Sequence, residues 1–166
     1  MSIKISFKKN INIKGPKNYV LFCDENFNIV SLKKYTSNSE FSYISDLLKI
    51  SDLKKNLLFF EINSKKTIYL VSIKKDLKKF DIESLGSKFH SYINYDKKND
   101  YFINSDTLNS KFQNFLGYFL HGIKLKSYEF NIYKSKKNKS LITINVIGNK
   151  NKISAQNQLR FKALEE

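Results

Sequence analysis

The sequence predicts one α/β domain built on a mixed sheet. Short apolar runs typical of strands alternate along the chain with segments whose apolar residues recur at helical spacing, which is the pattern of a sheet flanked by helices. A length of 166 residues is enough for one domain to bury a true core. No internal repeat and no low-complexity linker divides the chain, so we expect a single folded unit.

Apolar runs and alternation place the strands. Residues 3–7 alternate between apolar and polar side chains, as in a half-buried strand, whereas residues 19–23 are almost continuously apolar, as in a strand covered on both faces. The strongest candidates, residues 57–62 and 67–73, are joined by a linker short enough for a hairpin, which predicts an antiparallel pair. A clear strand at 141–147 and a brief one at 101–103 complete the sheet.

Helical spacing marks three shorter segments. An amphipathic helix is expected within residues 39–49, and another begins the stretch from residue 154 to 166. Asp81 can cap a further helix by accepting a free backbone N–H. The apolar stripe of that helix is Ile82, Leu85, Phe89, Tyr92 and Ile93.

The longest helical pattern covers residues 108–123, with one broad apolar stripe. Ser105 or Asp106 can cap its start. Gly117 and Gly122 lie inside it or at its end, where glycine costs about 1 kcal/mol relative to alanine. We interpret both as places where another backbone approaches closely, although ordinary tolerated glycines are an equal alternative.

The charge balance favours a basic surface without a specific nucleic-acid site. The net charge is +15, yet Arg160 is the single arginine among 30 basic residues. Arginine is the side chain that forks onto phosphates and guanines, and the abundance of Lys, Asn and Ile also reflects AT-rich codons. A scattered basic surface still attracts polyanions without specificity, so we retain nucleic acid as a weak partner.

The number of cysteines and the lengths of the apolar runs indicate where in the cell the protein is located. Cys23 is the single cysteine and forms no internal disulfide, and the first residues do not form the apolar core of a secretory signal. No apolar run approaches the roughly 18 residues that a membrane span needs. We therefore expect a cytoplasmic protein with no membrane partner.

Side chains with catalytic potential are few and scattered. His90 and His121 belong to no metal-binding spacing, and Cys23 lies in an apolar strand, so we interpret all three as structural. Neighbouring carboxylates occur at Asp24/Glu25, Asp46/Asp52 and Glu165/Glu166. Each pair lies at a turn or element end, where solvated charges are normal. We predict no catalytic residue, no bound cofactor and no metal ligand in this chain.

Glycine placement argues against a phosphate pocket. Phosphate cradles use glycine so that backbone N–H groups can approach the ligand. The chain has five glycines and no Gly-x-Gly. A nucleotide such as ADP-ribose is therefore a poor fit to this sequence.

Three stretches match the pattern of a known family. They are Gly122-x-x-Leu125-x-x-Tyr128-x-Phe130-x-x-Tyr133-Lys134, the strand and lysine-rich turn Ile68–Asp76, and the ending Gln158–Glu166. Together with the order of elements across nearly the whole chain, they resemble the amino-terminal domain of the leucyl (cytosol) aminopeptidase family and the linker helix that follows it.

The chain departs from that pattern in two places. The family often has Gly-x-Gly at the end of the second paired strand, where this chain has Ser72 and Lys74. The long helix is usually alanine-rich, whereas this one carries Phe112, Phe115 and Phe119.

The resemblance implies a macro-domain-like fold, that is, a mixed sheet flanked by helices on both faces. Residues 1–153 would form the amino-terminal domain, and residues 154–166 would begin a linker helix toward a carboxy-terminal catalytic domain. The full enzyme would be a cytoplasmic hexamer that removes amino-terminal residues from peptides with two divalent metals, Zn or Mn, held in the catalytic domain. We expect the 166-residue segment alone to be inactive, and to support hexamer assembly and access to the catalytic site.

Two other interpretations stay open. One is a lysine-rich module that binds DNA or another polyanion, and the other is a stand-alone nucleotide-binding macro domain. The aromatic run Tyr128, Phe130 and Tyr133 suits a contact with the catalytic domain or another subunit, or else a platform on which bases stack. The polyanion contacts would come from Lys134, Lys136 and Lys137.

Overall fold

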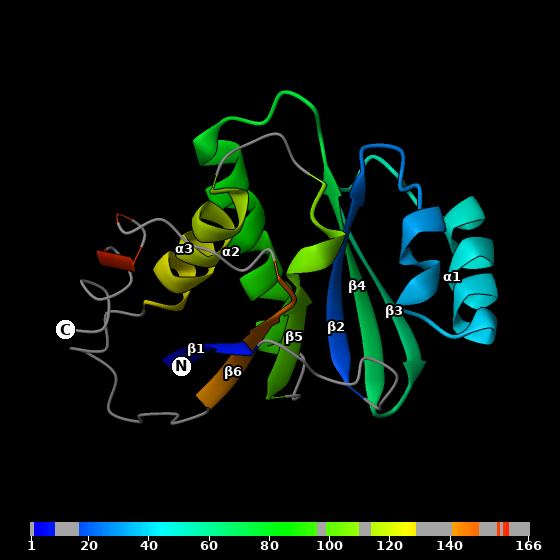
Figure 1. Cartoon of the computed structure of the whole chain (residues 1–166), viewed down its shortest axis with the longest axis horizontal. Helices are drawn as coiled ribbons and strands as arrows, with labels where there is room; N and C mark the ends of the chain where they lie inside the picture. The colour runs from blue at the N-terminus through cyan, green and yellow to red at the C-terminus, as the bar shows by residue number, and fades with distance from the viewer. Residues whose placement is uncertain are drawn as a thin grey trace.

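The computed structural model describes residues 2–8, 17–95, 99–109, 114–128, 141–149, 156 and 158–159. Six strands form one sheet in the order β1-β6-β5-β2-β4-β3 (Figure 1). Their bounds are β1 (Ser2–Lys8), β2 (Asn18–Asp24), β3 (Leu57–Asn63), β4 (Lys66–Ile73), β5 (Asp100–Asn104) and β6 (Leu141–Ile147).

The sheet is mixed, as the sequence predicts. β3 and β4 form the expected antiparallel hairpin, and every other neighbouring pair is parallel. At the far edge β1 pairs with β6, which places Ser6 beside Asn145, and the Ser6 Oγ donates to the Asn145 Oδ1 at 2.8 Å. The expected brief strand is β5.

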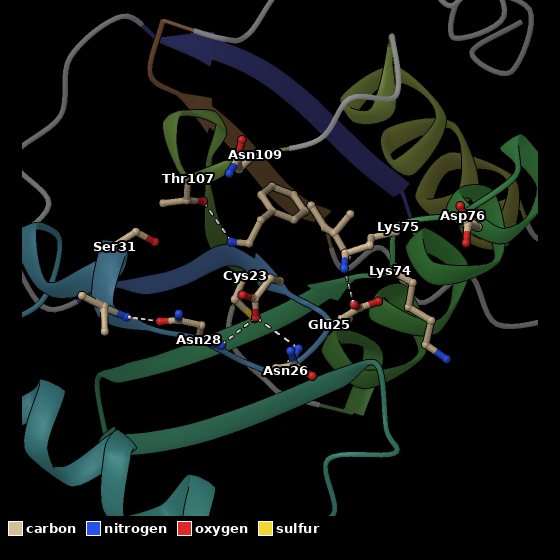
Figure 2. Close-up of a pocket in the computed structure, with 14 residues that line it drawn as sticks. Cys23, Glu25, Asn26, Asn28, Ser31, Lys74, Lys75, Asp76, Thr107 and Asn109 are labelled. Atoms are coloured by element: carbon tan, nitrogen blue, oxygen red, sulfur yellow. Dashed lines mark hydrogen bonds and ion pairs between the residues drawn. The ribbon is translucent and has the colours of Figure 1, made fainter.

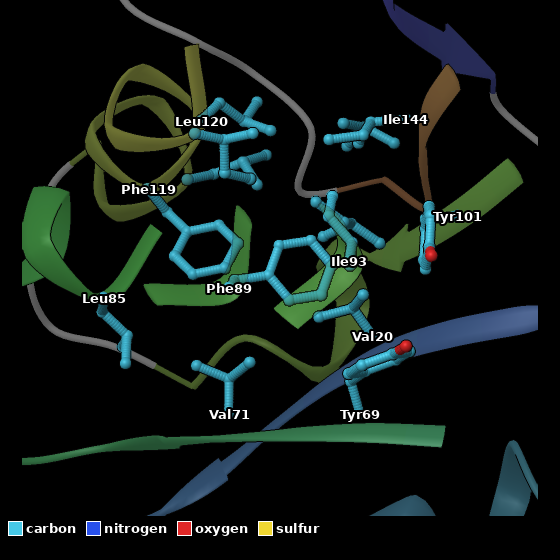
Figure 3. Packing of buried hydrophobic residues seen from close by; sticks show 14 of the residues in the cluster. Val20, Tyr69, Val71, Leu85, Phe89, Ile93, Tyr101, Phe119, Leu120 and Ile144 are labelled. Carbon is cyan, nitrogen blue, oxygen red and sulfur yellow. The ribbon is translucent and has the colours of Figure 1, made fainter. Parts of the chain in front are cut away.

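Helices cover both faces of the sheet (Figure 1). α2 (Lys79–Tyr95) and α3 (Phe115–Ser127) pack on one face, whose core includes Phe89 and Phe119 (Figure 3). α1 (Asn38–Ile50) and the short 3-10 helix η1 (Val30–Lys34) bury a second apolar cluster on the opposite face. The expectation of helices on both faces is therefore confirmed. Within the described part of the chain, no helix has the length and apolar character needed to cross a bilayer.

The start of the long helix differs from the prediction. α3 begins at Phe115, while residues 105–107 form the separate 3-10 helix η2 (Ser105–Thr107), and residues 110–113 lie outside the described residues. The Ser105 Oγ donates to the Ile147 carbonyl oxygen at 2.8 Å, and the Asp106 Oδ1 accepts from the Asn149 N–H at 2.8 Å. Neither residue caps α3, because the Ser105 side chain bonds to the last residue of β6 and the Asp106 side chain bonds to the segment after β6.

The other two helices follow the predicted patterns. Ser37 and Glu40 form a capping box at the start of α1, in which each side chain accepts the other residue's backbone N–H. α2 begins at Lys79, so Asp81 lies in the first turn and is not the residue that precedes the helix, as a cap would be. Its Oδ2 still accepts a free backbone N–H, that of Lys78, at 2.9 Å. The α2 stripe is buried except for Tyr92, which is 38% exposed. Most of the predicted helical stretch 154–166 lies outside the described residues.

α2 and α3 cross at two glycines. A Cβ atom on Gly86 would overlap the carbonyl oxygen of Phe119, and one on Gly122 would overlap the carbonyl oxygen of Glu83. The two backbones are therefore in direct contact, and the prediction that another backbone approaches Gly122 is confirmed. Beside this crossing, the His121 Nδ1 lies 2.9 Å from the Glu83 Oε1.

On the opposite face, a buried ion pair connects α1 to the hairpin. The Lys66 Nζ lies 2.6 Å from the Glu40 Oε1, and both side chains are largely removed from water. Burial acts to raise the pKa of Glu40, but the hydrogen bonds from Lys66 and Ser37 outweigh it, and the pKa lies below its ordinary value. The contribution of Glu40 to stability is therefore present at neutral pH and is lost as the pH falls through its lowered pKa.

Replacing Gly86 with alanine should destabilise the domain strongly. Alanine improves helix propensity by about 1 kcal/mol, but its methyl group would overlap a backbone carbonyl that no side-chain rotation can move away. We expect a net loss of roughly 3 kcal/mol, or a fall of about 10 °C in Tm by calorimetry. Lys88→Ala, at an exposed position of the same helix, is the control and should be nearly neutral. A Gly86→Ala variant as stable as the parent would disprove the close crossing.

Candidate functional site

A cleft of about 890 Å³ opens at the carboxyl ends of the central strands (Figure 2). Its lining residues lie at the ends of β2 and β4, in the segments that follow these strands, and in η1 and η2. After β2 the chain forms β3 and β4 on one side of β2, and it then forms β5 on the other side. The carboxyl ends of the parallel strands β2, β4 and β5 therefore mark a topological switch point. Open α/β sheets bind ligands at such points, which makes the cleft the candidate site.

The loop after β2 forms one wall of the cleft and is held by Asp24. The Asp24 Oδ1 accepts the backbone N–H groups of Asn26 at 3.1 Å and Asn28 at 2.8 Å. Between them Phe27 has a φ of 54°, which costs about 1 kcal/mol for a residue with a Cβ. The phenyl ring of Phe27 is buried in the core on the α1 face, and this burial offsets the cost.

The back of the cleft is closed by hydrogen bonds between elements. The Thr107 Oγ1 accepts the Phe22 N–H at 2.9 Å and donates to the Asn104 carbonyl oxygen at 2.8 Å. The Ser72 Oγ donates to the Asp24 carbonyl oxygen at 3.2 Å. These side chains join η2 and β4 to β2, and their hydrogen bonds are directed within the protein.

The charges at the cleft are mixed and do not form an anion cradle. Asp24, Glu25 and Asp76 line it together with Lys74 and Lys75, and the Lys75 Nζ lies 3.3 Å from the Glu25 Oε1 (Figure 2). None of the fourteen described lining residues is glycine, so side chains stand where a phosphate would need bare backbone N–H groups. The carboxylates would also repel a phosphate.

Most of the predicted contact residues lie beyond the described part of the chain. Tyr128 is described: it follows the last residue of α3 and is 60% exposed. Phe130, Tyr133, Lys134, Lys136 and Lys137 lie outside the described residues. Their roles stay predictions.

The structure shows the surroundings of several residues that were singled out for possible chemistry. His90 is buried in α2, and His121 is engaged by Glu83. Asp46 pairs with Lys49 at 2.8 Å on the surface of α1. The Asp52 Oδ1 accepts the Lys54 N–H at 3.1 Å, while Glu165 and Glu166 lie outside the described residues.

The described residues do not fit the two-metal centre that the family resemblance implies elsewhere. Within the described ranges, no three His, Cys, Asp or Glu side chains gather closely enough to hold a metal ion. The acidic residues at the cleft include Asp24, which already accepts two backbone N–H groups, and Glu25, which pairs with Lys75. We therefore derive no metal chemistry from this part of the chain.

Cys23 is a core residue, as its sequence context predicts. It is buried in β2, and its Sγ donates to the Val71 carbonyl oxygen at 3.6 Å. Burial, and to a smaller extent the nearby Asp24 carboxylate, raise the pKa of the thiol to about 12. The thiol therefore stays protonated and unreactive near neutral pH.

The residues of the cleft lie far apart in the sequence, and no local pattern brings them together. Asp24 ends one strand and is followed by Glu25-Asn26, and Lys74-Lys75-Asp76 follows another strand. Parallel strands end at the same edge of a sheet, and this rule places the two segments side by side. Using it required the knowledge that β2 and β4 are parallel neighbours.

Comparison with known proteins relates the fold to two groups. No family model matches this sequence, and no curated protein matches it. Among solved structures, 82 chains match. One is a mutant of tomato leucine aminopeptidase, with 16% identity over 99% of this chain and a TM-score of 0.65. Another is the macrodomain of Thermus aquaticus DarG, with 6% identity over 89% of this chain, 100% of that chain and a TM-score of 0.55.

The fold is macrodomain-like. The likeness to leucine aminopeptidase that the sequence predicts is confirmed at the level of the fold. This chain spans 36% of the tomato enzyme chain.

The thiol of Cys23 should be protected in the folded protein. With its pKa raised to about 12, reaction with 5,5′-dithiobis(2-nitrobenzoate) at pH 8 should be about a hundredfold or more slower than in guanidinium chloride. Val30→Cys in a Cys23→Ala background is the matched control, because Val30 is 70% exposed, and it should react rapidly in the native state. Equal rates for Cys23 in native and denatured protein would contradict its burial.

Proposed function

We propose that this chain is a non-catalytic domain of a leucyl aminopeptidase-like metallopeptidase. The observation that carries the proposal is the match of 99% of the chain, at a TM-score of 0.65, to little more than a third of the tomato enzyme. In this proposal, peptide hydrolysis belongs to a region equivalent to the remainder of that enzyme.

The contacts of the polar side chains support a structural role for this domain. His121, Asp24 and Thr107 are each engaged in contacts that join one element to another or hold a loop. Cys23 is protonated and buried. These side chains hold the domain together, which suits a part that braces a larger assembly better than a part that performs chemistry.

The proposed domain organisation follows from the same likeness. Residues 1–153 would form the macro-like domain, and residues 154–166 would begin the helix that leads to the catalytic domain. Two divalent metals, Zn or Mn, would be held there by ligands outside this chain. This domain would stabilise a hexamer and limit access to the catalytic interior. Exposed Tyr128, followed by Phe130 and Tyr133, is the proposed contact with the catalytic domain or a neighbouring subunit.

This proposal is tested on the product of the complete reading frame that contains this chain. We expect light scattering to show a hexamer that hydrolyses leucine p-nitroanilide with Mn²⁺ or Zn²⁺. The same protein without residues 1–166 should lose the hexamer, and the 166-residue chain alone should be inactive. Metal-dependent turnover by the 166-residue chain, or a reading frame without a metal-binding domain, would overturn the proposal.

The alternative function is weak binding of DNA or another polyanion. The observation in its favour is the net charge of +15, and Lys134, Lys136 and Lys137 are the proposed contacts. The cleft is a poor place for this contact, because three carboxylates line it.

Gel retardation tests the alternative. If the basic surface binds DNA, random-sequence duplex should be retarded at low salt, and the shift should disappear as salt rises, because binding releases condensed counterions. Replacing Lys134, Lys136 and Lys137 together with glutamine should weaken retardation, whereas the same change at Lys49, Lys54 and Lys55 serves as the charge-matched control. Absence of any shift at low salt would exclude this function.

A further inference from the structure

Within the described part of the chain, β3 is the last strand at one edge of the sheet. Among the described residues it pairs with β4 alone. The Ser72 N–H donates to the Asn56 carbonyl oxygen at 2.9 Å, so residues 56 and 72 form a hydrogen-bonded pair of this antiparallel ladder. Because such pairs alternate along the ladder, the N–H and C=O groups of Leu57, Phe59 and Glu61 point away from β4.

Apolar side chains flank this open edge on both faces of the sheet. On the α2 face, Phe59 is 48% exposed and its ring centroid lies 5.6 Å from that of Tyr92. On the α1 face, Leu58 and Ile62 are partly buried against the core. A strand added at this edge would cover these groups while its backbone bonded to the three outward-facing residues.

The two edges of the sheet differ in their protection. β1, at the other edge, carries the exposed residues Lys4 and Lys8 within the strand, and such lysines discourage pairing with another chain. β3 contains none of the 30 basic residues, and its single charged residue is Glu61. A bulge after Glu61 limits the length of the edge without covering it.

The residues at the two ends of β3 indicate the charge of the partner. Lys54 and Lys55 are exposed just before the strand, and Lys65 is exposed just after it. If two copies of β3 paired in an antiparallel manner about their centre, Lys55 of one copy would face Lys65 of the other at both ends. A second copy is therefore repelled, whereas a segment with acidic residues at its ends is attracted.

From this geometry we infer that the open edge of β3 binds an extended peptide segment of a partner protein, apolar in its middle and acidic at both ends. The segment adds a strand to the sheet. Its backbone bonds to Leu57, Phe59 and Glu61, its apolar side chains cover Phe59 and Tyr92 on one face and Leu58 and Ile62 on the other, and its acidic ends lie near the flanking lysines. The inference is independent of the proposed peptidase role.

The test uses a fluorescein-labelled peptide, Glu-Glu-Val-Thr-Val-Thr-Val-Glu-Glu, with blocked ends and the full 166-residue chain. We expect saturable binding by fluorescence polarisation, weakening as salt rises. Hydrogen exchange of the amides of Leu57, Phe59 and Glu61 should slow by about tenfold or more at saturation. A peptide with the same centre and lysine ends should bind about tenfold or more weakly at low salt. One with proline at alternate positions should not bind, because it lacks the donors.

Variants locate the binding edge. Phe59→Lys should reduce affinity about tenfold or more, because it removes the exposed ring and adds repulsion at the centre of the edge. Val30→Lys, which adds the same charge at an exposed position on the cleft, should bind like the parent. Circular dichroism and Tm confirm that both variants are folded.

Three results would overturn the inference. The first is absence of binding by the acidic peptide at low salt. The second is equal binding of the acidic, lysine and proline peptides, or equal affinity of Phe59→Lys and Val30→Lys. The third is a dimer by light scattering whose β3 amides are protected without peptide, because the edge would then be occupied by a second copy.

Discussion

The fold on the α2–α3 face depends on one constraint, the close approach of Gly86 to the backbone of Phe119 and of Gly122 to the backbone of Glu83. Because neither glycine has a Cβ, α2 and α3 touch through their backbones. Their larger side chains can then turn toward the sheet, where the Phe89 and Phe119 ring centroids lie 5.8 Å apart. Phe89 also makes edge contacts with Tyr69 and Tyr101, so one aromatic cluster connects both helices to the sheet (Figure 3).

The opposite face depends on a polar connection. Glu40 uses one carboxylate oxygen to complete the capping box of α1 and the other to accept from Lys66 at the start of β4. One side chain therefore sets where α1 begins and where it lies on the hairpin. Breaking such a pair by removing one partner leaves a charge buried without compensation, which is a larger loss than the pair's net contribution to stability.

The sequence predicts those features that depend on local pattern. The β3–β4 hairpin, the buried stripe of α2 and the burial of Cys23 follow from periodicity and composition, and the structure confirms them. The predicted start of the long helix is wrong because Ser105 and Asp106 bind residues more than forty positions away. The candidate cleft was missed for the same reason: its walls belong to strands whose order in the sheet is set by tertiary packing, which no local pattern encodes.

The pairing of β1 with β6 bears on how the chain folds. Ser6 and Asn145 are hydrogen-bonded across 139 positions of sequence, so β1 can complete this pairing only after β6 has been synthesised. A nascent chain that ends before Leu141 offers β1 none of its native partner. Contacts between residues so far apart in sequence are slow to form, because the chain loses the conformational entropy of the intervening loop before the pairing compensates for it. We therefore expect the pairing of β1 with β6 to form late, after residues 141–147 have been synthesised.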